Sequence, residues 1–252
     1  MIDLKNKTVL VTGASRGIGA AIVRVCVAAG ANVVIHYGQA RDRAEALAAE
    51  LGADRCLLLA ADLTDPASQP QLWADACAWK GNIDVLVNNA GIFEGVAVDA
   101  PYDEWCAVWN KTMQVNMSAT ANLCRDAIGH FKGQGGGIII NVTSRAAFRG
   151  DDPDFMHYAA SKAAVVALTR SIARGFAPDG ILAYVVAPGF TRTEMAEAFV
   201  AEYGEDAATA NIPLGKMATP EEVAHMVAFL ATGLVPSGTG SVMDINGASY
   251  VR

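Results

Sequence analysis

Tyr158 and Lys162 are the residues in this sequence whose types and spacing most directly point to chemistry. They lie four positions apart in the stretch H-Y-A-A-S-K (157–162), so a helix would place both side chains on one face. A free tyrosine is a poor acid near neutral pH, because its pKa is about 10. A nearby lysine ammonium favours the phenolate and lowers that pKa, which suits a proton donor in ketone reduction. The same pair also occurs as two ordinary residues of an amphipathic helix, and the hexapeptide alone does not separate the two interpretations.

A glycine-rich stretch near the N terminus has the composition of a phosphate-binding turn. The sequence V-T-G-A-S-R-G-I-G (11–19) follows an apolar run and precedes an amphipathic helical pattern. A strand, a glycine turn and a helix N terminus together present backbone N–H groups and the positive end of the helix dipole to an anion. We therefore expect Gly13, Gly17 and Gly19 to approach the pyrophosphate of a dinucleotide. A purely structural turn is the alternative.

Short apolar runs alternate with longer helical patterns along the whole chain. The inner runs lack polar alternation, as parallel strands covered on both faces do. The expected strands are Thr8–Thr12, Asn32–His36, Arg55–Ala60, Ile83–Val87, Gly137–Val142, Ile181–Ala187 and Ser241–Ile245. The expected helices cover 17–29, 41–51, 66–79, 101–132, 157–177 and 219–231. This alternation predicts one α/β domain over residues 1–252, with a Rossmann-like, doubly wound parallel sheet of seven strands and helices on both faces.

The segment 188–218 follows the sixth strand and contains several turn signals and one weak helical pattern at 193–202. A long segment of this kind in a compact domain often covers a ligand site. We therefore expect a substrate lid here, with a surface insertion as the alternative.

The composition argues against several classes of protein. Of the 252 residues, 52% are hydrophobic, and the net charge of −7 leaves no basic surplus for nucleic acid or an anionic membrane. The five cysteines are scattered without a C-x-x-C, and the four histidines show no paired spacing, so we expect neither disulfides nor a metal site. The N terminus has no apolar leader, and no run reaches the roughly 18 residues that span a bilayer. We expect a soluble cytoplasmic protein.

Further motifs follow the successive strands in order. They are Asp62-Leu63 after the third strand, N-N-A-G (88–91) after the fourth, Asn116 in the long helix, Ser144 after the fifth and P-G-F-T (188–191) after the sixth. With the glycine turn and the Tyr158/Lys162 pair, this series resembles the short-chain dehydrogenase/reductase family over the whole chain. The resemblance implies an NAD(P)-dependent oxidoreductase that transfers a hydride between the cofactor and a carbonyl or secondary alcohol.

The resemblance also implies the cofactor contacts. Asp62 would bond the adenine amino group, Asn89-Ala90-Gly91 would line the adenosine ribose, and Thr191 would hold the nicotinamide carboxamide. Taken alone, Asp62 would be an ordinary turn carboxylate or helix cap. The full expected set is Gly13, Ser15, Arg16, Gly17, Ile18, Gly19, Tyr37, Arg41, Asp62, Leu63, Asn89, Ala90, Gly91, Tyr158, Lys162, Pro188, Gly189 and Thr191.

The end of the second strand bears on the choice of cofactor. NAD enzymes of this fold place an acid there for the ribose 2′-hydroxyl, whereas this sequence has V-V-I-H-Y-G-Q, with Tyr37 at the expected position. The missing carboxylate removes the main repulsion against a 2′-phosphate, and Arg16, Arg41 and Arg43 are candidates to bind one. Arg41 and Arg43 are equally well explained as helix-face residues. We expect NADP(H) to be preferred, with NAD(H) possible.

The catalytic residues that the resemblance implies are Asn116, Ser144, Tyr158 and Lys162. Tyr158 would be the acid, and Lys162 with the positive nicotinamide would lower its pKa. The Ser144 hydroxyl would orient the substrate oxygen, with Thr143 beside it as a competing hydroxyl. Asn116 would help to hold a water that connects the lysine to solvent; its alternative is a buried polar residue that satisfies backbone groups.

The loop between Ser144 and Tyr158 is slightly longer than in many relatives. Loops absorb insertions at little cost in free energy, so we expect the pocket wall to differ and the catalytic set to be retained. The expected substrate contacts are Phe93, Phe148, Arg149, Met156 and His157. His157 points off the Tyr158/Lys162 face, which favours a packing or pocket role over that of a base.

Two substrate classes remain open. The motifs A-P-G-F and D-I-N-G resemble the 3-oxoacyl-(acyl-carrier-protein) reductases. Acyl carrier proteins are acidic, however, and this chain is acidic too, with Asp179 where a basic residue would suit that partner. A small-molecule ketone, sugar or alcohol is at least as well supported, and the intact acid site disfavours a non-catalytic dinucleotide-binding regulator. Surplus apolar and small residues on helices 101–132 and 157–177 predict a subunit contact, and the family commonly forms homotetramers.

Overall fold

The computed structural model describes residues 2–252, apart from the side chains of Met195 and Ala198. One parallel sheet has the strand order β3-β2-β1-β4-β5-β6-β7. The strands are β1 (Thr8–Val11), β2 (Asn32–Tyr37), β3 (Cys56–Ala60), β4 (Val85–Asn88), β5 (Gly137–Val142), β6 (Ile181–Pro188) and β7 (Val242–Ile245). The expected sheet is confirmed, and six of the strands differ from the expectation by one or two residues at their ends. The strand order reverses between β1 and β4, and in such folds the crevice at this point binds the ligand.

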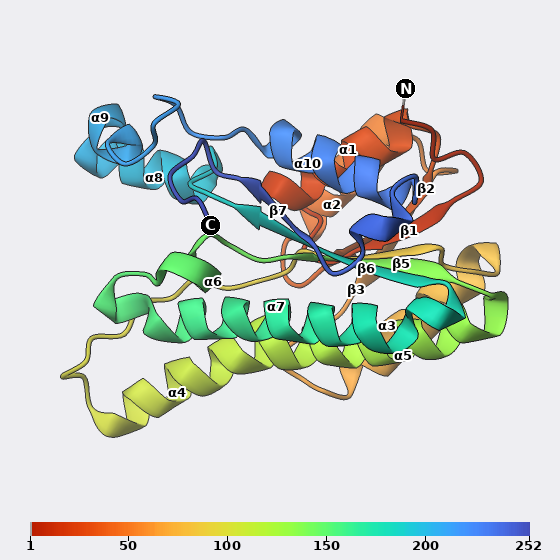
Figure 1. The fold of residues 1–252 in the computed structure, drawn as a ribbon, viewed down its shortest axis with the longest axis horizontal. Coiled ribbons are helices and arrows are strands. Elements are labelled where there is room, and N and C mark those ends of the chain that lie inside the picture. Colours follow the sequence, from red (N-terminus) through yellow and green to blue (C-terminus); the bar gives the residue numbers. More distant parts are fainter. Residues whose placement is uncertain (1) are drawn as a thin grey trace.

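Helices cover both faces of the sheet (Figure 1). One layer consists of α1 (Gly17–Ala28), α2 (Arg41–Leu51) and α10 (Pro220–Ala231), and the other of α3 (Ser68–Lys80), α5 (Ala119–Gln134) and α7 (Met156–Phe176). Along β1, Val9 and Val11 pack in the core under the first layer, and Leu10 packs in the core under the second. All three side chains are fully buried. This two-sided burial explains why the inner strands are apolar at every position.

The long helix expected at 101–132 consists of three parts. These are α4 (Tyr102–Met113), a π-helical turn η1 (Gln114–Ser118) and α5. Hydrophobic periodicity does not reveal one wide turn inside a long helix, so the sequence pattern showed a single element. Such turns occur frequently at functional sites, and this one carries Asn116.

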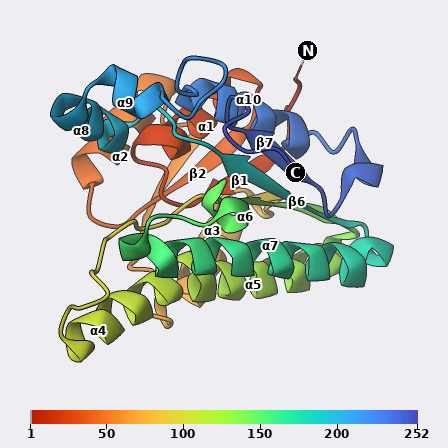
Figure 2. The ribbon, with the colours of Figure 1, turned by 60° about the vertical axis from the view of Figure 1, so that its left-hand side comes forward.

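Several short elements gather beyond the carboxyl ends of the strands, at the end of the molecule that carries α6, α8 and α9 in Figures 1 and 2. After β5 come α6 (Ala146–Arg149) and a 3₁₀ turn (Pro153–Phe155), where the sequence predicted only a loop. The segment 188–218 contains two helices, α8 (Glu194–Tyr203) and α9 (Glu205–Thr209), instead of the single weak helix expected. It has a small apolar cluster of its own, formed by Ala196, Ala208, Ile212 and Met217.

Local signals in the sequence explain where α10 begins. Thr219 and Glu222 form a reciprocal capping box, and Pro220 occupies the first turn, where its missing N–H costs nothing. Two further 3₁₀ turns, Ala177–Asp179 and Pro236–Gly238, flank β6 and β7. Within residues 2–252, no helix is both long and apolar enough to cross a membrane.

Candidate active site

The glycine turn between β1 and α1 is packed against the loop after β4. Gly13 and Gly17 have φ angles of +61° and +53°, in the left-handed region that favours glycine. A Cβ at Gly19 would lie 2.3 Å from the Gly13 carbonyl oxygen, so a larger residue does not fit there. The Asn89 amide donates to the carbonyl oxygens of Thr12 (2.9 Å) and Gly13 (3.1 Å). Asn89 therefore fixes the conformation of the turn, and its glycines leave the backbone uncovered by side chains.

A cleft of about 1000 Å³ lies over this turn. Eleven of the expected cofactor residues line it: Gly13, Ser15, Arg16, Gly17, Ile18, Gly19, Asp62, Leu63, Asn89, Ala90 and Gly91. Further lining residues were not among those expected, namely His36, Gly38, Gln39, Ala40, Ala61, Thr64, Ile92, Glu94, Lys111, Val115, Thr193 and Glu194. Most of these additions are immediate neighbours of expected residues. Glu194 and Thr193 come from the start of α8, which no local motif identified.

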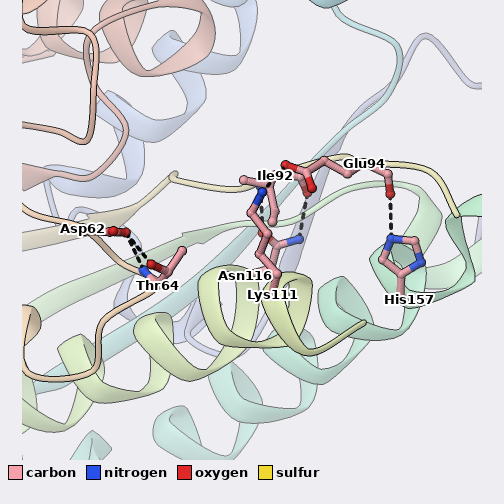
Figure 3. Close-up of polar contacts among 7 residues, drawn as sticks. All are labelled: Asp62, Thr64, Ile92, Glu94, Lys111, Asn116 and His157. Atoms are coloured by element: carbon pink, nitrogen blue, oxygen red, sulfur yellow. Dashed lines mark hydrogen bonds and ion pairs between the residues drawn. The ribbon is translucent and has the colours of Figure 1, made fainter. Parts of the chain in front are cut away.

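Asp62 lies at one end of the cleft with its carboxylate fixed by the next turn. Its Oδ1 accepts hydrogen bonds from the Thr64 backbone N–H (2.9 Å) and hydroxyl (2.8 Å) (Figure 3). The backbone hydrogen bond is the main cause that lowers the pKa of Asp62, followed by the hydroxyl. Asp62 is therefore an oriented, ionised acceptor beside the cleft.

Two residues expected at the adenosine end lie elsewhere. The Tyr37 side chain is buried in the core under α1 and α2, and Gly38, Gln39 and Ala40 line the cleft instead. The reason is the pleat, since the last strand residue can point to either face and the sequence does not reveal which. Arg41 forms an i,i+4 ion pair with Glu45 at 2.7 Å and does not line the cleft.

The residues expected at the nicotinamide end lie beyond this cleft. Pro188 ends β6, and a Cβ at Gly189 would lie 2.7 Å from the Cβ of Asn246, so the chain passes tightly here. The Thr191 side chain is buried and donates to the Gly189 carbonyl at 3.1 Å. These residues form a rigid exit from the sheet, and Thr191 makes an isolated parallel bridge with Ala218.

Asn116, Ser144, Tyr158 and Lys162 do not line this cleft, but its lining residue Gly91 lies beside two of them. A Cβ there would lie 3.1 Å from Lys162 Nζ and 3.3 Å from Asn116 Oδ1. Lys162 is only 5% exposed and donates to the Val142 carbonyl at 3.2 Å. The Asn116 amide clamps Ile92, accepting from its N–H at 2.8 Å and donating to its carbonyl at 3.1 Å (Figure 3). Asn116 therefore fixes the loop between the cleft and Lys162.

Burial opposes the charged forms of both Tyr158 and Lys162. It raises the pKa of Tyr158 to about 12, against a lowering by the neighbouring Ser144 side chain. It also lowers the pKa of Lys162 to about 8. Lys162 Nζ lies 5.7 Å from the centre of the Tyr158 ring. The expected fall in the pKa of Tyr158 is thus not produced by the residues of the chain alone, and it requires further positive charge.

Phe93 lies directly beside Tyr158. Its ring stacks on Phe155 at 4.0 Å and meets the Tyr158 ring edge-on at 4.8 Å. Ser144 Oγ accepts from the Ala146 N–H at 3.1 Å, so the start of α6 orients this hydroxyl. Thr143 instead points its hydroxyl to the Val186 carbonyl, inside the sheet. Of the two neighbouring hydroxyls, Ser144 is the one on the side of Tyr158.

The other expected substrate contacts differ in their surroundings. Phe148 stacks on Tyr250 at 6.2 Å, Arg149 lies 4.0 Å from Asp151, and Met156 is exposed. His157 is a correction, because its side chain is 1% exposed and its Nε2 donates to the Glu94 carbonyl at 2.7 Å (Figure 3). This environment agrees with a packing role for His157 and does not agree with contact between His157 and the substrate.

Comparisons with known proteins place the chain in a family. The family model described as short chain dehydrogenase matches residues 7–204. The 3-oxoacyl-(acyl-carrier-protein) reductase FabG of Escherichia coli (strain K12) is 35% identical over 251 residues, covering 99% of this chain and 100% of that protein. The cis-4-hydroxycyclohexanecarboxylate dehydrogenase of Sinomonas cyclohexanicum is 36% identical over 244 residues, 96% of each chain. A crystal structure of a dehydrogenase/reductase from Sinorhizobium meliloti 1021 superposes with a TM-score of 0.90 at 34% identity, covering 99% and 97% of the two chains.

The chain belongs to the short-chain dehydrogenase/reductase family and is an oxidoreductase of that family. Membership implies that it depends on NAD or NADP. The described residues contain no cluster of histidine, cysteine or acidic side chains that would hold a metal ion.

Proposed function

We propose that the protein transfers a hydride between NADP(H) and a small-molecule ketone or secondary alcohol, with Tyr158 as the proton donor and acceptor. The observation that carries this proposal is the contact between the cleft and the Tyr158/Lys162 pair: a Cβ on the cleft residue Gly91 would lie 3.1 Å from Lys162 Nζ, which in turn lies 5.7 Å from the centre of the Tyr158 ring. In this arrangement Tyr158, the proposed proton donor, lies next to the proposed dinucleotide site, with the buried Lys162 beside it.

The residues of the cleft fit a dinucleotide. Backbone without side chains at Gly13, Gly17 and Gly19 suits a pyrophosphate at the N terminus of α1, where the helix dipole favours negative charge. Asp62 is oriented to accept a hydrogen bond from an adenine amino group. When bound, the nicotinamide supplies or accepts the hydride and carries a positive charge in its oxidised form.

The chain's own residues handle the proton. In carbonyl reduction, the Tyr158 hydroxyl donates its proton to the oxygen that becomes the alcohol, while the Ser144 hydroxyl holds that oxygen. Lys162, whose pKa of about 8 lets it exchange a proton near neutral pH, stabilises the phenolate that Tyr158 leaves. Asn116 acts as a positioning residue, because both N–H donors of its amide are used by Ile92 and Ser161 and its oxygen accepts from the Ile92 N–H.

The preference for NADP rests on the wall of the cleft between β2 and α2. The stretch H-Y-G-Q-A (36–40) brings no carboxylate to this wall, and Arg16 lines it. Glu194 makes ion pairs with both Arg16 (3.8 Å) and Arg43, so it would compete with a 2′-phosphate for them. Kinetics with both cofactors test the preference, and equal or higher kcat/KM with NAD(H) would overturn it. Glu194→Gln should lower the KM for NADPH more than that for NADH.

The substrate class follows from charge and from the relatives. Asp179 forms an ion pair with Lys132 at 3.3 Å, so the surface there offers little uncompensated positive charge to an acidic carrier protein. A relative is named for a small hydroxylated ring carboxylate, and another for an acyl-carrier-protein substrate. We favour the free small molecule and keep acyl-carrier-protein reduction as the second candidate. Turnover of ketones and polyols without turnover of acetoacetyl thioesters supports the first, and the reverse result supports the second.

A non-catalytic dinucleotide-binding role is the remaining alternative. The proximity of Lys162 to the cleft residue Gly91, with Tyr158 between Lys162 and the Ser144 hydroxyl, argues against it. Tight NADPH binding with no turnover of any carbonyl would favour it.

We propose further that the chain is a single domain that works as a cytoplasmic homotetramer, with 188–218 as a lid. Apolar side chains remain exposed on α4 and the loop before it, among them Tyr102 at 82% and Val98 at 64%. Burial of these side chains against a second copy would favour association. Sedimentation of the purified protein tests this, and a monomer at micromolar concentration would refute it.

A further inference from the structure

Arg145 directly follows Ser144 and carries a guanidinium with an unsatisfied donor. The residue is half-buried, and its Nη1 is buried without a hydrogen-bond partner. Among the described side chains, no carboxylate oxygen lies within the 4.0 Å of an ion pair with Arg145. A buried guanidinium N–H without an acceptor is unfavourable in free energy, so this one nitrogen of the half-buried side chain calls for a partner.

The backbone of Arg145 is fixed on both sides. Its N–H donates to the Pro188 carbonyl at 2.9 Å, which ties it to the end of β6. Its carbonyl accepts from the N–H groups of Phe148 (3.0 Å) and Arg149 (3.1 Å) in α6. The side chain therefore starts from a rigid point one residue from the hydroxyl that orients the substrate oxygen.

The surrounding charges leave Arg145 available to an anion. Burial is the main cause that lowers its pKa, the nearby Arg149 adds to this, and Asp151 opposes it. Asp151 also acts on Tyr158, whose pKa it raises. The charge of Asp151 thus acts on both Arg145 and Tyr158. Arg252, which lies over the Phe148 ring of α6 at 4.1 Å, is already paired with Asp244.

We propose that Arg145 binds an anionic group of the substrate, a carboxylate on the same small molecule that carries the carbonyl. This assignment rests on the proposed function and narrows it from ketones in general to oxo acids and the corresponding hydroxy acids. A planar guanidinium matches a carboxylate through two parallel N–H···O bonds, and partial burial strengthens such a pair. The carboxylate would satisfy the buried Nη1 and fix the distance between anion and carbonyl.

The test compares substrates that have one shape and differ by one charge. Reduction of 4-acetylbenzoate and 4-acetylbenzamide by NADPH is measured with wild type, Arg145→Met, Arg145→Lys and the control Arg174→Met, an exposed arginine on α7. The aliphatic pair 4-oxopentanoate and 4-oxopentanamide is run in parallel, so that two different distances between carbonyl and carboxylate are tested. We expect kcat/KM to favour the acid, and Arg145→Met to remove about 10- to 100-fold from the acid alone, the range of a charge-assisted hydrogen bond. Arg145→Lys should restore part of this loss, and Arg174→Met should leave it unchanged.

The outcomes separate the two proposals. Reduction of both amides with no preference for either acid overturns the anion site and leaves the proposed function standing. Failure to reduce any of the four ketones counts against the proposed function. Binding of 4-acetylbenzoate to the NADPH-loaded protein, measured by calorimetry, still decides the site in that case. Tighter binding of the acid than of the amide, lost in Arg145→Met, supports it, and equal binding refutes it.

A second substitution distinguishes a substrate site from an internal ion pair. If Arg145 served only to neutralise Asp151, Asp151→Asn would lower the stability of the protein and leave the acid-to-amide ratio unchanged. For a substrate site, removing this neighbouring negative charge should raise the ratio several-fold. An unchanged ratio in Asp151→Asn together with an unchanged ratio in Arg145→Met would exclude the proposal.

Discussion

Lys162 should make the protein less stable at neutral pH than a protein with an apolar side chain at this position. Its pKa falls from 10.5 to about 8 because the ammonium is buried. At pH 7 the lysine is charged in both the folded and the unfolded chain, so the whole difference acts against folding. A shift of this size corresponds to about 3 kcal/mol. The hydrogen bond from Nζ to the Val142 carbonyl offsets about 1 kcal/mol of it.

The perturbation is Lys162→Met, which keeps an unbranched side chain, one atom shorter, and removes the charge. We expect the free energy of unfolding of the cofactor-free protein to rise by about 1 to 2 kcal/mol at pH 7, while carbonyl reduction is lost. Urea unfolding at one fixed protein concentration measures the change. The control is Lys216→Met, an exposed lysine, for which we expect a change within about 0.5 kcal/mol.

The dependence on pH makes the test specific. Because the folded-state pKa is depressed, the folded wild type releases its proton near pH 8, whereas the unfolded chain keeps it up to about pH 10.5. The wild type therefore gains stability relative to the variant as the pH rises through this window. Between pH 7 and pH 9.5 the advantage of Lys162→Met should shrink by about 2 kcal/mol. An advantage that stays constant with pH, or a variant that is less stable than wild type at pH 7, would refute the reasoning.

Three further predictions concern the hydroxyls of Ser144 and Thr143, the glycine turn and the start of α10. Ser144→Ala should lower kcat for carbonyl reduction by about 10²-fold or more, whereas Thr143→Val should change thermal stability and leave kcat within a few-fold of wild type, as steady-state kinetics would show. Gly19→Ala should weaken NADPH binding at least tenfold, measured by nicotinamide fluorescence, because its Cβ would meet the Gly13 carbonyl; unchanged affinity would show that the turn adapts. Thr219→Ala removes one half of the α10 capping box and should lower the free energy of unfolding by about 1 kcal/mol, and Thr219→Ser should restore most of it.

The fold was predictable because its signals are local. A few consecutive residues are enough to recognise an apolar strand such as Gly137–Val142, the glycine turn, or the start of α10 at Thr219. The order of the strands then brings Ser144 and Tyr158 to the same edge of the sheet.

What the sequence could not show depends on contacts between distant residues. The ion pair of Glu194 with Arg43 joins residues 151 positions apart. The burial of Tyr37 depends on which face the last residue of β2 takes, and the burial of His157 depends on the Glu94 carbonyl across the cleft wall. None of these partners is marked by the pattern around the residue itself.

The π-helical turn at Gln114–Ser118 makes the long helix intolerant of a change in length. Such a turn accommodates a residue more than an α-helical turn does, so a deletion inside it would yield a continuous and locally more regular α-helix. The same deletion would rotate α4 relative to α5 by about 100°, the angle of one residue in an α-helix. Lys111 would then turn away from Glu94, and the clamp of Asn116 on Ile92 would be lost. The irregular turn thus sets the rotation of α4 relative to α5. A chain shortened by one residue here should keep a folded sheet, while the loop that carries Ile92 and Glu94 loses its fixed position.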